Sequence, residues 1–152
     1  MNTWSAAGAA TCSSCPSGKR SRGDRQACVD CPAGTQLDTA SGICKACPVG
    51  KASSQINSAC QTCPTGTYAA TVGQTTCVSC PKGMVPSATR AACVRCSLGE
   101  YVSADGSQCL ACAAGKYGPD GDACVDCPSG SYSGTTGAAA CTPCPAGHIS
   151  AI

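Results

Sequence analysis

The chain is poor in the residues that build an ordinary core or an ionic binding surface. Its 152 residues include no Phe, one Trp and four Tyr, and these large side chains supply much of the buried area in most domains. Charged residues make up 12% of the sequence, and a net charge of +2 gives no reason to expect nucleic acid as a partner. No apolar stretch approaches the roughly 18 residues that cross a bilayer. The composition therefore predicts neither a conventional hydrophobic core nor a membrane-spanning segment.

Cysteine takes the place of the missing core residues. The 18 cysteines form nine Cys-x-x-Cys pairs, and a glycine stands three residues after the second cysteine of every pair. Seven pairs are followed directly by Pro, and all four tyrosines lie two residues after the glycine. The pairs begin at Cys12, Cys28, Cys44, Cys60, Cys77, Cys93, Cys109, Cys124 and Cys141. The spacing of 15 to 17 residues makes the whole chain a tandem repeat.

Each repeated position has a physical role. Proline fixes φ and begins a turn, and the glycine two residues later can adopt the positive φ that closes it. The segment before the next cysteine is small and polar, which is typical of a hairpin tip in solvent. A unit of about 16 residues cannot bury a core alone, so neighbouring units must stack or be tied together. We expect an elongated rod or solenoid of irregular hairpins, with little regular secondary structure and no helix-dominated core.

Cys-x-x-Cys pairs are also typical of zinc sites and of redox motifs. A four-cysteine zinc site uses two pairs, so nine pairs leave one over, and His148 alone could substitute, at the far end of the chain. A thioredoxin-like pair needs a helix N-terminus, and nothing here has helical periodicity. Structural disulfides are the better prediction, and they favour an extracellular protein. No metal and no cofactor are expected.

Two disulfide schemes are open. A local scheme joins the second cysteine of one pair to the first cysteine of the next; the alternative joins first to first and second to second across adjacent units. The local scheme, which we favour, gives Cys15–Cys28, Cys31–Cys44, Cys47–Cys60, Cys63–Cys77, Cys80–Cys93, Cys96–Cys109, Cys112–Cys124 and Cys127–Cys141. It leaves Cys12 and Cys144 unpaired within the segment.

The unpaired cysteines bear on domain organisation. Residues 1–11 look like the tail of a preceding repeat or an N-terminal segment, because Trp4 stands upstream of Cys12 much as the tyrosines stand upstream of their cysteines. Residues 12–144 hold eight repeats closed by a ninth pair, and residues 145–152 begin a further, incomplete repeat. The chain is then a window on a longer array, which we favour, or a protomer whose ends complete each other.

The unit Cys-x-x-Cys-Pro-x-Gly-x-Tyr, best matched at residues 63–68 and 127–132, resembles the ephrin-receptor-like cysteine-rich repeat. It is also similar to the first module of tumour-necrosis-factor-receptor-type domains. Tandem arrays of this kind look like those in large surface antigens and mastigoneme-type proteins of ciliates and other protists. Residues 96–101 and 112–117 depart from the pattern, because Ser97 and Ala113 replace Pro. The resemblance implies an extracellular, disulfide-bonded protein without catalytic activity, and it implies no particular ligand.

Weaker sequence patterns that could indicate a binding site, a metal site or a modification also have simpler explanations. Arg22, Gly23 and Asp24 form a tripeptide that could present an adhesion loop, although such a tripeptide also arises by chance. Asp120 and Asp122 fall short of the six to eight oxygens that calcium takes, so a solvated turn is expected there. No catalytic constellation can be assembled, and no enzyme is expected. Serine and threonine in the tips could carry O-linked glycans.

Two functions remain. The first is a structural extracellular protein, a segment of a filament, rod or cell-surface coat, with copies of itself as the main partner. The second is a ligand-binding receptor or adhesion ectodomain. Uniformity of the units favours the first, because a binding protein usually departs from its repeat where it holds a ligand.

Overall fold

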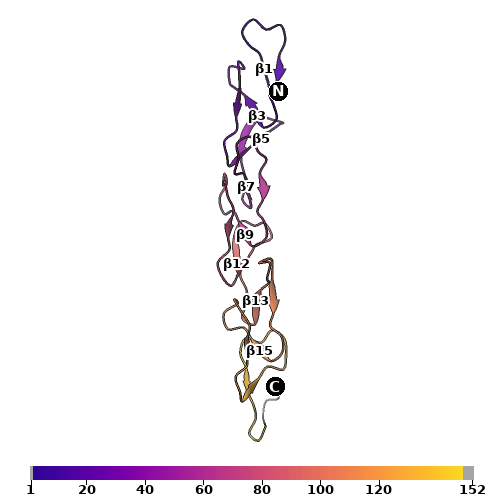
Figure 1. Cartoon of the computed structure of the whole chain (residues 1–152), viewed down its shortest axis with the longest axis vertical. Helices are drawn as coiled ribbons and strands as arrows, with labels where there is room; N and C mark the ends of the chain where they lie inside the picture. Colours follow the sequence, from indigo (N-terminus) through magenta and orange to yellow (C-terminus); the bar gives the residue numbers. More distant parts are fainter. Residues whose placement is uncertain (1, 149–152) are drawn as a thin grey trace. The chain divides into compact units, whose positions relative to one another are not determined.

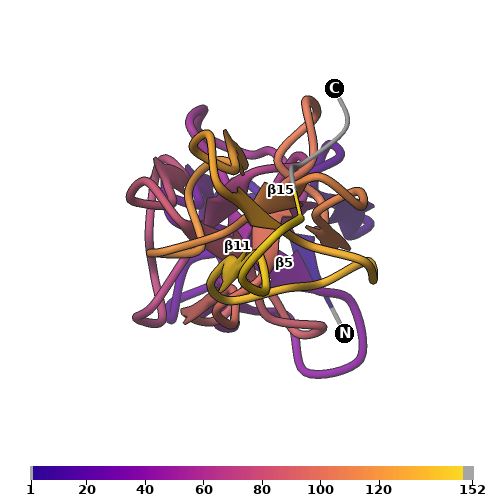
Figure 2. The same cartoon turned by 90° about the horizontal axis from the view of Figure 1, so that it is seen from below.

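The computed structural model describes residues 2–148, and within that range the chain consists of short strands joined by turns, with no helix (Figure 1). The strands are β1 (Thr3–Trp4), β2 (Ser13–Ser14), β3 (Lys19–Ser21), β4 (Cys28–Asp30), β5 (Thr35–Asp38), β6 (Ile43–Ala46), β7 (Lys51–Ala52), β8 (Gln61–Thr62), β9 (Thr67–Tyr68), β10 (Val78–Ser79), β11 (Met84–Pro86), β12 (Cys93–Arg95), β13 (Glu100–Val102), β14 (Cys109–Ala111), β15 (Lys116–Tyr117), β16 (Val125–Asp126), β17 (Ser131–Tyr132) and β18 (Thr142–Pro143). Each pairs only with its neighbour in sequence, giving two-stranded sheets. The second view likewise shows short arrows and loops (Figure 2). A disulfide-rich hairpin repeat was predicted, and the structure confirms that fold class.

The chain divides into two compact units. Unit 1 comprises residues 1–64, 68–78 and 89–92, and unit 2 comprises residues 65–67, 79–88 and 93–152. The hairpins β1–β2, β3–β4, β5–β6 and β7–β8 lie in unit 1, and those from β11–β12 to β17–β18 lie in unit 2. Residues 149–152 of the incomplete repeat predicted over 145–152 lie outside the described part of the chain. The described residues accordingly include no helix that is long and apolar enough to span a membrane.

The repeat motif goes with one register in the hairpins from β3–β4 to β7–β8 and from β11–β12 to β17–β18. The residue two positions after the motif glycine faces the residue that follows the first cysteine of the next pair, as in Tyr101 opposite Leu110 and Tyr117 opposite Val125. Trp4 faces Ser13 in the same way, so Asn2 stands where later units have glycine. The motif thus sets which side chains meet across each ladder.

A tight turn opens each hairpin. The N–H group of Thr35 donates to the carbonyl of Pro32 at 3.1 Å, and Gly34 between them has a φ of +80°. All nine motif glycines have φ between +70° and +84°, which confirms the positive φ expected from the sequence. Lys116 makes the same bond to Ala113 at 3.1 Å, although that unit lacks proline. The turn uses the carbonyl at this position, so Pro is replaceable there while the glycine is not.

Sulfur fills the interior. The structure joins the second cysteine of each pair to the first cysteine of the next, in eight disulfides with Cα–Cα distances of 5.5 to 5.8 Å. The largest fully buried side chains are all second cysteines: Cys31, Cys47, Cys63 and Cys112. Several large apolar side chains stay exposed, Val72 and Leu98 among them. Cross-links, rather than aliphatic packing, therefore form the centre of each unit.

The hairpin tips hold a second residue with positive φ, which the sequence analysis missed. Six of these residues are glycine, and the other three are Arg25, Asn57 and Arg90, with φ of +54° to +58°. The tip glycines are Gly8, Gly42, Gly73, Gly106, Gly121 and Gly137. Each tip residue lies two to four residues before the next cysteine, and this variable spacing hides the period.

The longest ladder, β5–β6, carries an acidic side chain with a strongly perturbed pKa. The ion pair with Lys45, with help from the Ser41 hydroxyl at 2.6 Å, lowers the pKa of Asp38 to about 2. Because the folded state prefers the carboxylate, the contact stabilises the hairpin above about pH 4 and is lost as pH falls towards 2. We expect Lys45→Met to raise the pKa of Asp38 towards its ordinary value, measured from the carboxyl carbon-13 shift. Lys51→Met is the matched control and should leave that titration unchanged.

Candidate functional site

The most regular feature of the molecule is a contact between motif glycines and hairpin tips two units ahead. In unit 1 a Cβ on Gly34 would overlap the carbonyl oxygen of Gly73, and one on Gly50 would overlap that of Thr89. In unit 2 Gly99 faces Gly137 in the same way. We call each such glycine with its incoming tip a seat. Glycine is required at a tight seat because it has a positive φ and because a backbone carbonyl lies where its side chain would be.

Backbone hydrogen bonds hold the tip in its seat. The N–H of Gly73 donates to the carbonyl of Cys47 at 2.8 Å, and Gly137 donates to Cys112 at 2.8 Å. Asn57 makes the same bond to Cys31 at 2.9 Å. In these three seats the acceptor is a buried second cysteine. The tip thereby satisfies a carbonyl of the disulfide core, as a buried backbone group requires.

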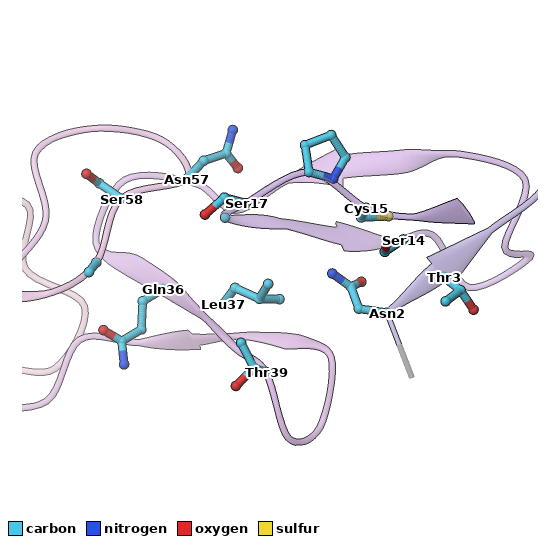
Figure 3. Close-up of a pocket in the computed structure, with 13 residues that line it drawn as sticks. Asn2, Thr3, Ser14, Cys15, Ser17, Gln36, Leu37, Thr39, Asn57 and Ser58 are labelled. Atoms are coloured by element: carbon cyan, nitrogen blue, oxygen red, sulfur yellow. The ribbon is translucent and has the colours of Figure 1, made fainter. Parts of the chain in front are cut away.

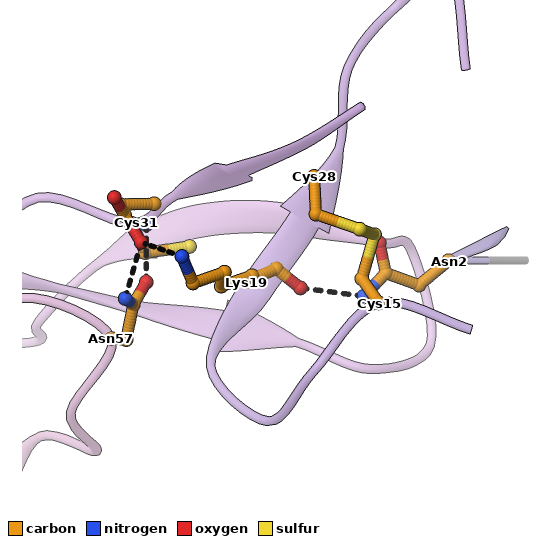
Figure 4. Close-up of polar contacts among 7 residues, drawn as sticks. Asn2, Cys15, Lys19, Cys28, Cys31 and Asn57 are labelled. Carbon is orange, nitrogen blue, oxygen red and sulfur yellow. Dashed lines mark hydrogen bonds and ion pairs between the residues drawn. A yellow bond between two sulfur atoms is a disulfide. The ribbon is translucent and has the colours of Figure 1, made fainter. Parts of the chain in front are cut away.

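One seat is reinforced by side chains (Figure 4). Asn57 accepts a hydrogen bond from the N–H of Cys31 at 2.8 Å, and its amide donates to Asp30 at 2.5 Å. Lys19 forms an ion pair with Asp30 at 2.9 Å. The hydrogen bond from Asn57, followed by the contacts with Lys19, lowers the pKa of Asp30. These contacts fix the tip, so the group of polar residues is structural and leaves no reactive side chain free.

A groove of about 590 Å³ lies beside this seat in unit 1 (Figure 3). Leu37 lies between Asn2 and Asn57 in the view, and the other lining side chains are neutral. All three amide side chains of the lining already have partners: Asn2 bonds to the backbone of Lys19 and Ser21 at 2.6 and 2.5 Å, Gln36 accepts from the N–H of Cys60 at 2.9 Å, and Asn57 bonds as described above. With no titratable group in its lining, the groove is not equipped for acid–base or nucleophilic chemistry.

The Arg22–Gly23–Asp24 tripeptide lies at the tip of the β3–β4 hairpin, and all three residues are exposed. The guanidinium of Arg22 contacts the carboxylate of Asp24 at 3.4 Å. The N–H of Gln26 also donates to Asp24 at 3.0 Å. The loop is therefore available to a partner from outside.

Two cysteines lack a disulfide partner among the described residues. Cys12 is exposed, and Cys144 is half-buried. Cys144 nonetheless donates its N–H to the carbonyl of Gly130 at 2.9 Å, the bond that Cys47 makes to Gly34 and Cys63 to Gly50. It thus has the backbone environment of the bonded second cysteines.

No metal site is visible in the described residues, where no group of three or more His, Cys, Asp and Glu side chains gathers. Asp120, weighed above as a calcium ligand, accepts a hydrogen bond from the N–H of Asp122 at 3.0 Å, as in an ordinary turn. Its carbonyl accepts from Arg95 at 3.1 Å.

Comparison with known proteins gives one positive finding. The model of a family described as tyrosine-protein kinase ephrin type A/B receptor-like matches residues 50–92 and 115–151. The interval between the two matches, residues 93–114, contains both pairs that lack the following Pro. No curated protein matched the chain. Repeats of this type and eight disulfides together indicate an extracellular or secreted protein.

Proposed function

Because the chain belongs to the ephrin type A/B receptor-like family of cysteine-rich repeats, we propose that it is a structural extracellular repeat protein. It forms a segment of a filament, rod or cell-surface coat and assembles with copies of itself. Its role is mechanical: the chain acts as a spacer and catalyses no reaction. O-linked glycans on the tip serines and threonines belong to the same proposal.

The observation that carries this proposal is the repetition of the seat. The same glycine, tip and second-cysteine carbonyl recur in both units, and backbone atoms make most of the contacts. Such contacts depend on the repeat and little on individual side chains, so they suit an array that adds identical modules. In the groove, the amide side chains of Asn2, Gln36 and Asn57 already bond to other groups of the chain.

Electron microscopy of negatively stained native material tests the proposal. Ordered fibres or sheets with a regular axial repeat are the expected result. Dispersed particles that show no order at any protein concentration would contradict it.

A receptor or adhesion ectodomain is the second candidate, and the exposed Arg22–Gly23–Asp24 loop favours it. If this function holds, the purified chain should support cell attachment, and Asp24→Ala should abolish it. Asp122→Ala, which changes an acidic residue in another tip, is the matched control.

A further inference from the structure

We propose that unit 2 contains a flexible joint, at which the hairpins β11–β12 and β13–β14 pivot on each other while their disulfides stay intact. The joint consists of Gly83, Pro86 and the tip of residues 103–108, whose backbone groups do not interlock as their counterparts do in other hairpins. The proposal goes beyond the structural function, because it concerns motion within one chain and does not depend on assembly.

Two backbone hydrogen bonds lock neighbouring hairpins elsewhere. In the first, the N–H of a motif glycine donates to the residue three positions after the next motif glycine. Gly50 donates to Ala69 in this way at 2.8 Å, and Gly99 donates to Gly118 at the same distance. In the second bond, the N–H of that residue donates to the following hairpin tip, as Ala69 does to Arg90 at 2.9 Å. Together the two bonds tie three successive hairpins to one another.

Neither bond joins β11–β12 to β13–β14 among the described residues. Pro86 stands three residues after Gly83, where Ala69 and Gly118 stand in their hairpins, and proline has no N–H to donate. The N–H of Gly83 has no acceptor in the described part of the chain, although Gly83 and Gly99 are both buried. Buried N–H groups are almost always paired in rigid structures, so Gly83 marks a place that opens to water.

The tip of β13–β14 is closed on itself rather than on its seat. The N–H of Gly106 donates to the carbonyl of Ser103 at 2.8 Å, whereas the N–H of Gly137 donates to a second cysteine. The carboxylate of Asp105 accepts from the Ser103 hydroxyl at 2.6 Å and from the N–H of Ser107 at 3.1 Å. The tip therefore keeps its shape without support from the other hairpins.

The seats beside the joint are loose, and a hollow lies next to them. The Cβ positions of Gly66 and Gly83 lie 3.7 and 3.6 Å from the nearest atoms of their tips, without the overlap found at Gly99. Met84 and Val102 are among the residues that line a hollow of about 240 Å³ at these seats. Because close packing is what holds neighbouring elements in place, the hollow leaves the two hairpins room to move.

Unit 1 has a counterpart of this joint, 65 residues earlier, that is braced by a side chain. Gly18 lines the groove of unit 1 as Gly83 lines the hollow of unit 2. The tip residue there is Asn57, whose side chain accepts a hydrogen bond from the N–H of Cys31 at 2.8 Å. The tip residue in the corresponding place of unit 2 is Gly121, which has no side chain to bond. The missing brace is a further reason why the joint of unit 2 moves.

Nitrogen-15 relaxation dispersion and native-state hydrogen exchange of the whole chain test the joint. The N–H of Gly83 should exchange about tenfold or more faster than that of Gly99, because a hydrogen bond protects only the latter. The amides of Gly83, Val102 and Gly106 should show dispersion on the microsecond-to-millisecond time scale, and that of Gly118 should not. Flat profiles at Gly83 and Val102 would overturn the proposal even if exchange is fast, because water would then fill a rigid hollow.

Pro86→Ser supplies the missing donor. Ser53 stands at this position in unit 1, where its N–H donates to the following tip at 3.2 Å. The variant should lower the population of the open state, measured from the dispersion at Gly83, by about twofold or more. Pro128→Ser is the matched control, because it changes a motif proline outside the joint, and Ser97 shows that serine fits there. An equal effect of the two variants would contradict the joint.

Asn57→Gly is the converse variant in unit 1. Glycine is the residue at six of the nine tips, so the variant should keep its eight disulfides. Loss of the brace should produce dispersion at Gly18 that the unchanged chain lacks. A folded variant with a flat profile at Gly18 would show that the brace does not restrain the hairpins, and the proposal would fall. Either failure leaves the structural function standing, because microscopy of assemblies tests that function separately.

Discussion

Reduction of the disulfides is expected to unfold the chain completely, whereas a chelator is expected to leave it intact. Each closed loop spans 12 to 14 residues, and a loop of about this size restricts the unfolded chain by about 3 kcal/mol. Loss of only a few loops exceeds the roughly 5–15 kcal/mol by which most domains are stable. The buried side chains that would remain are chiefly cysteine and alanine, and they cannot hold the fold. Circular dichroism and limited proteolysis, each with reductant or chelator, measure the difference.

The same material tests the cross-links themselves. Thiol titration of the unassembled chain should find two reactive groups, Cys12 and Cys144, before reduction. Peptide mapping without reductant should recover only local pairs such as Cys47–Cys60. Peptides that join first to first and second to second cysteines would support the alternative scheme. Loss of structure on chelation, with indifference to reductant, would contradict a disulfide core altogether.

The hairpin repeat could be predicted from the sequence because its determinants are local. A Cys-x-x-Cys pair and a glycine three residues later act within one turn and one disulfide loop, so their spacing survives in the sequence. The positive φ of Gly34 and its eight counterparts follows from that local pattern. The fold class could therefore be predicted without any tertiary information.

The seats could not be predicted, because they join residues about 39 positions apart and use backbone atoms. A backbone carbonyl such as that of Gly73 is present whatever the side chain, so its contact does not constrain the neighbouring residue types. The tip residue does leave a signal, since glycine holds six of nine positions, but variable spacing from the next cysteine obscures it. Asn57 and the two arginines, Arg25 and Arg90, hide it further. Aligning the units on positive-φ residues would have revealed the second period.

The largest effect of a single substitution is expected at an occupied seat. Gly50→Ala should destabilise the chain far more than Gly115→Ala, although both glycines have nearly the same φ, +78° and +82°. An alanine in the left-handed region costs about 1–2 kcal/mol, and both variants lose that amount. Only at Gly50 does the new methyl group also overlap a backbone carbonyl, that of Thr89, and such overpacking typically adds about 1–3 kcal/mol.

Denaturant unfolding of the two variants, in the Cys12→Ser/Cys144→Ser background with the eight disulfides intact, measures the difference between their free energies of unfolding. Gly83→Ala provides a graded control, because the nearest atom to its Cβ position, the carbonyl oxygen of Asp120, lies 3.6 Å away. It should therefore behave like Gly115→Ala, since 3.6 Å is ordinary contact. Equal losses at Gly50 and Gly115 would mean that the tip of residues 89 and 90 does not rest on Gly50 in solution.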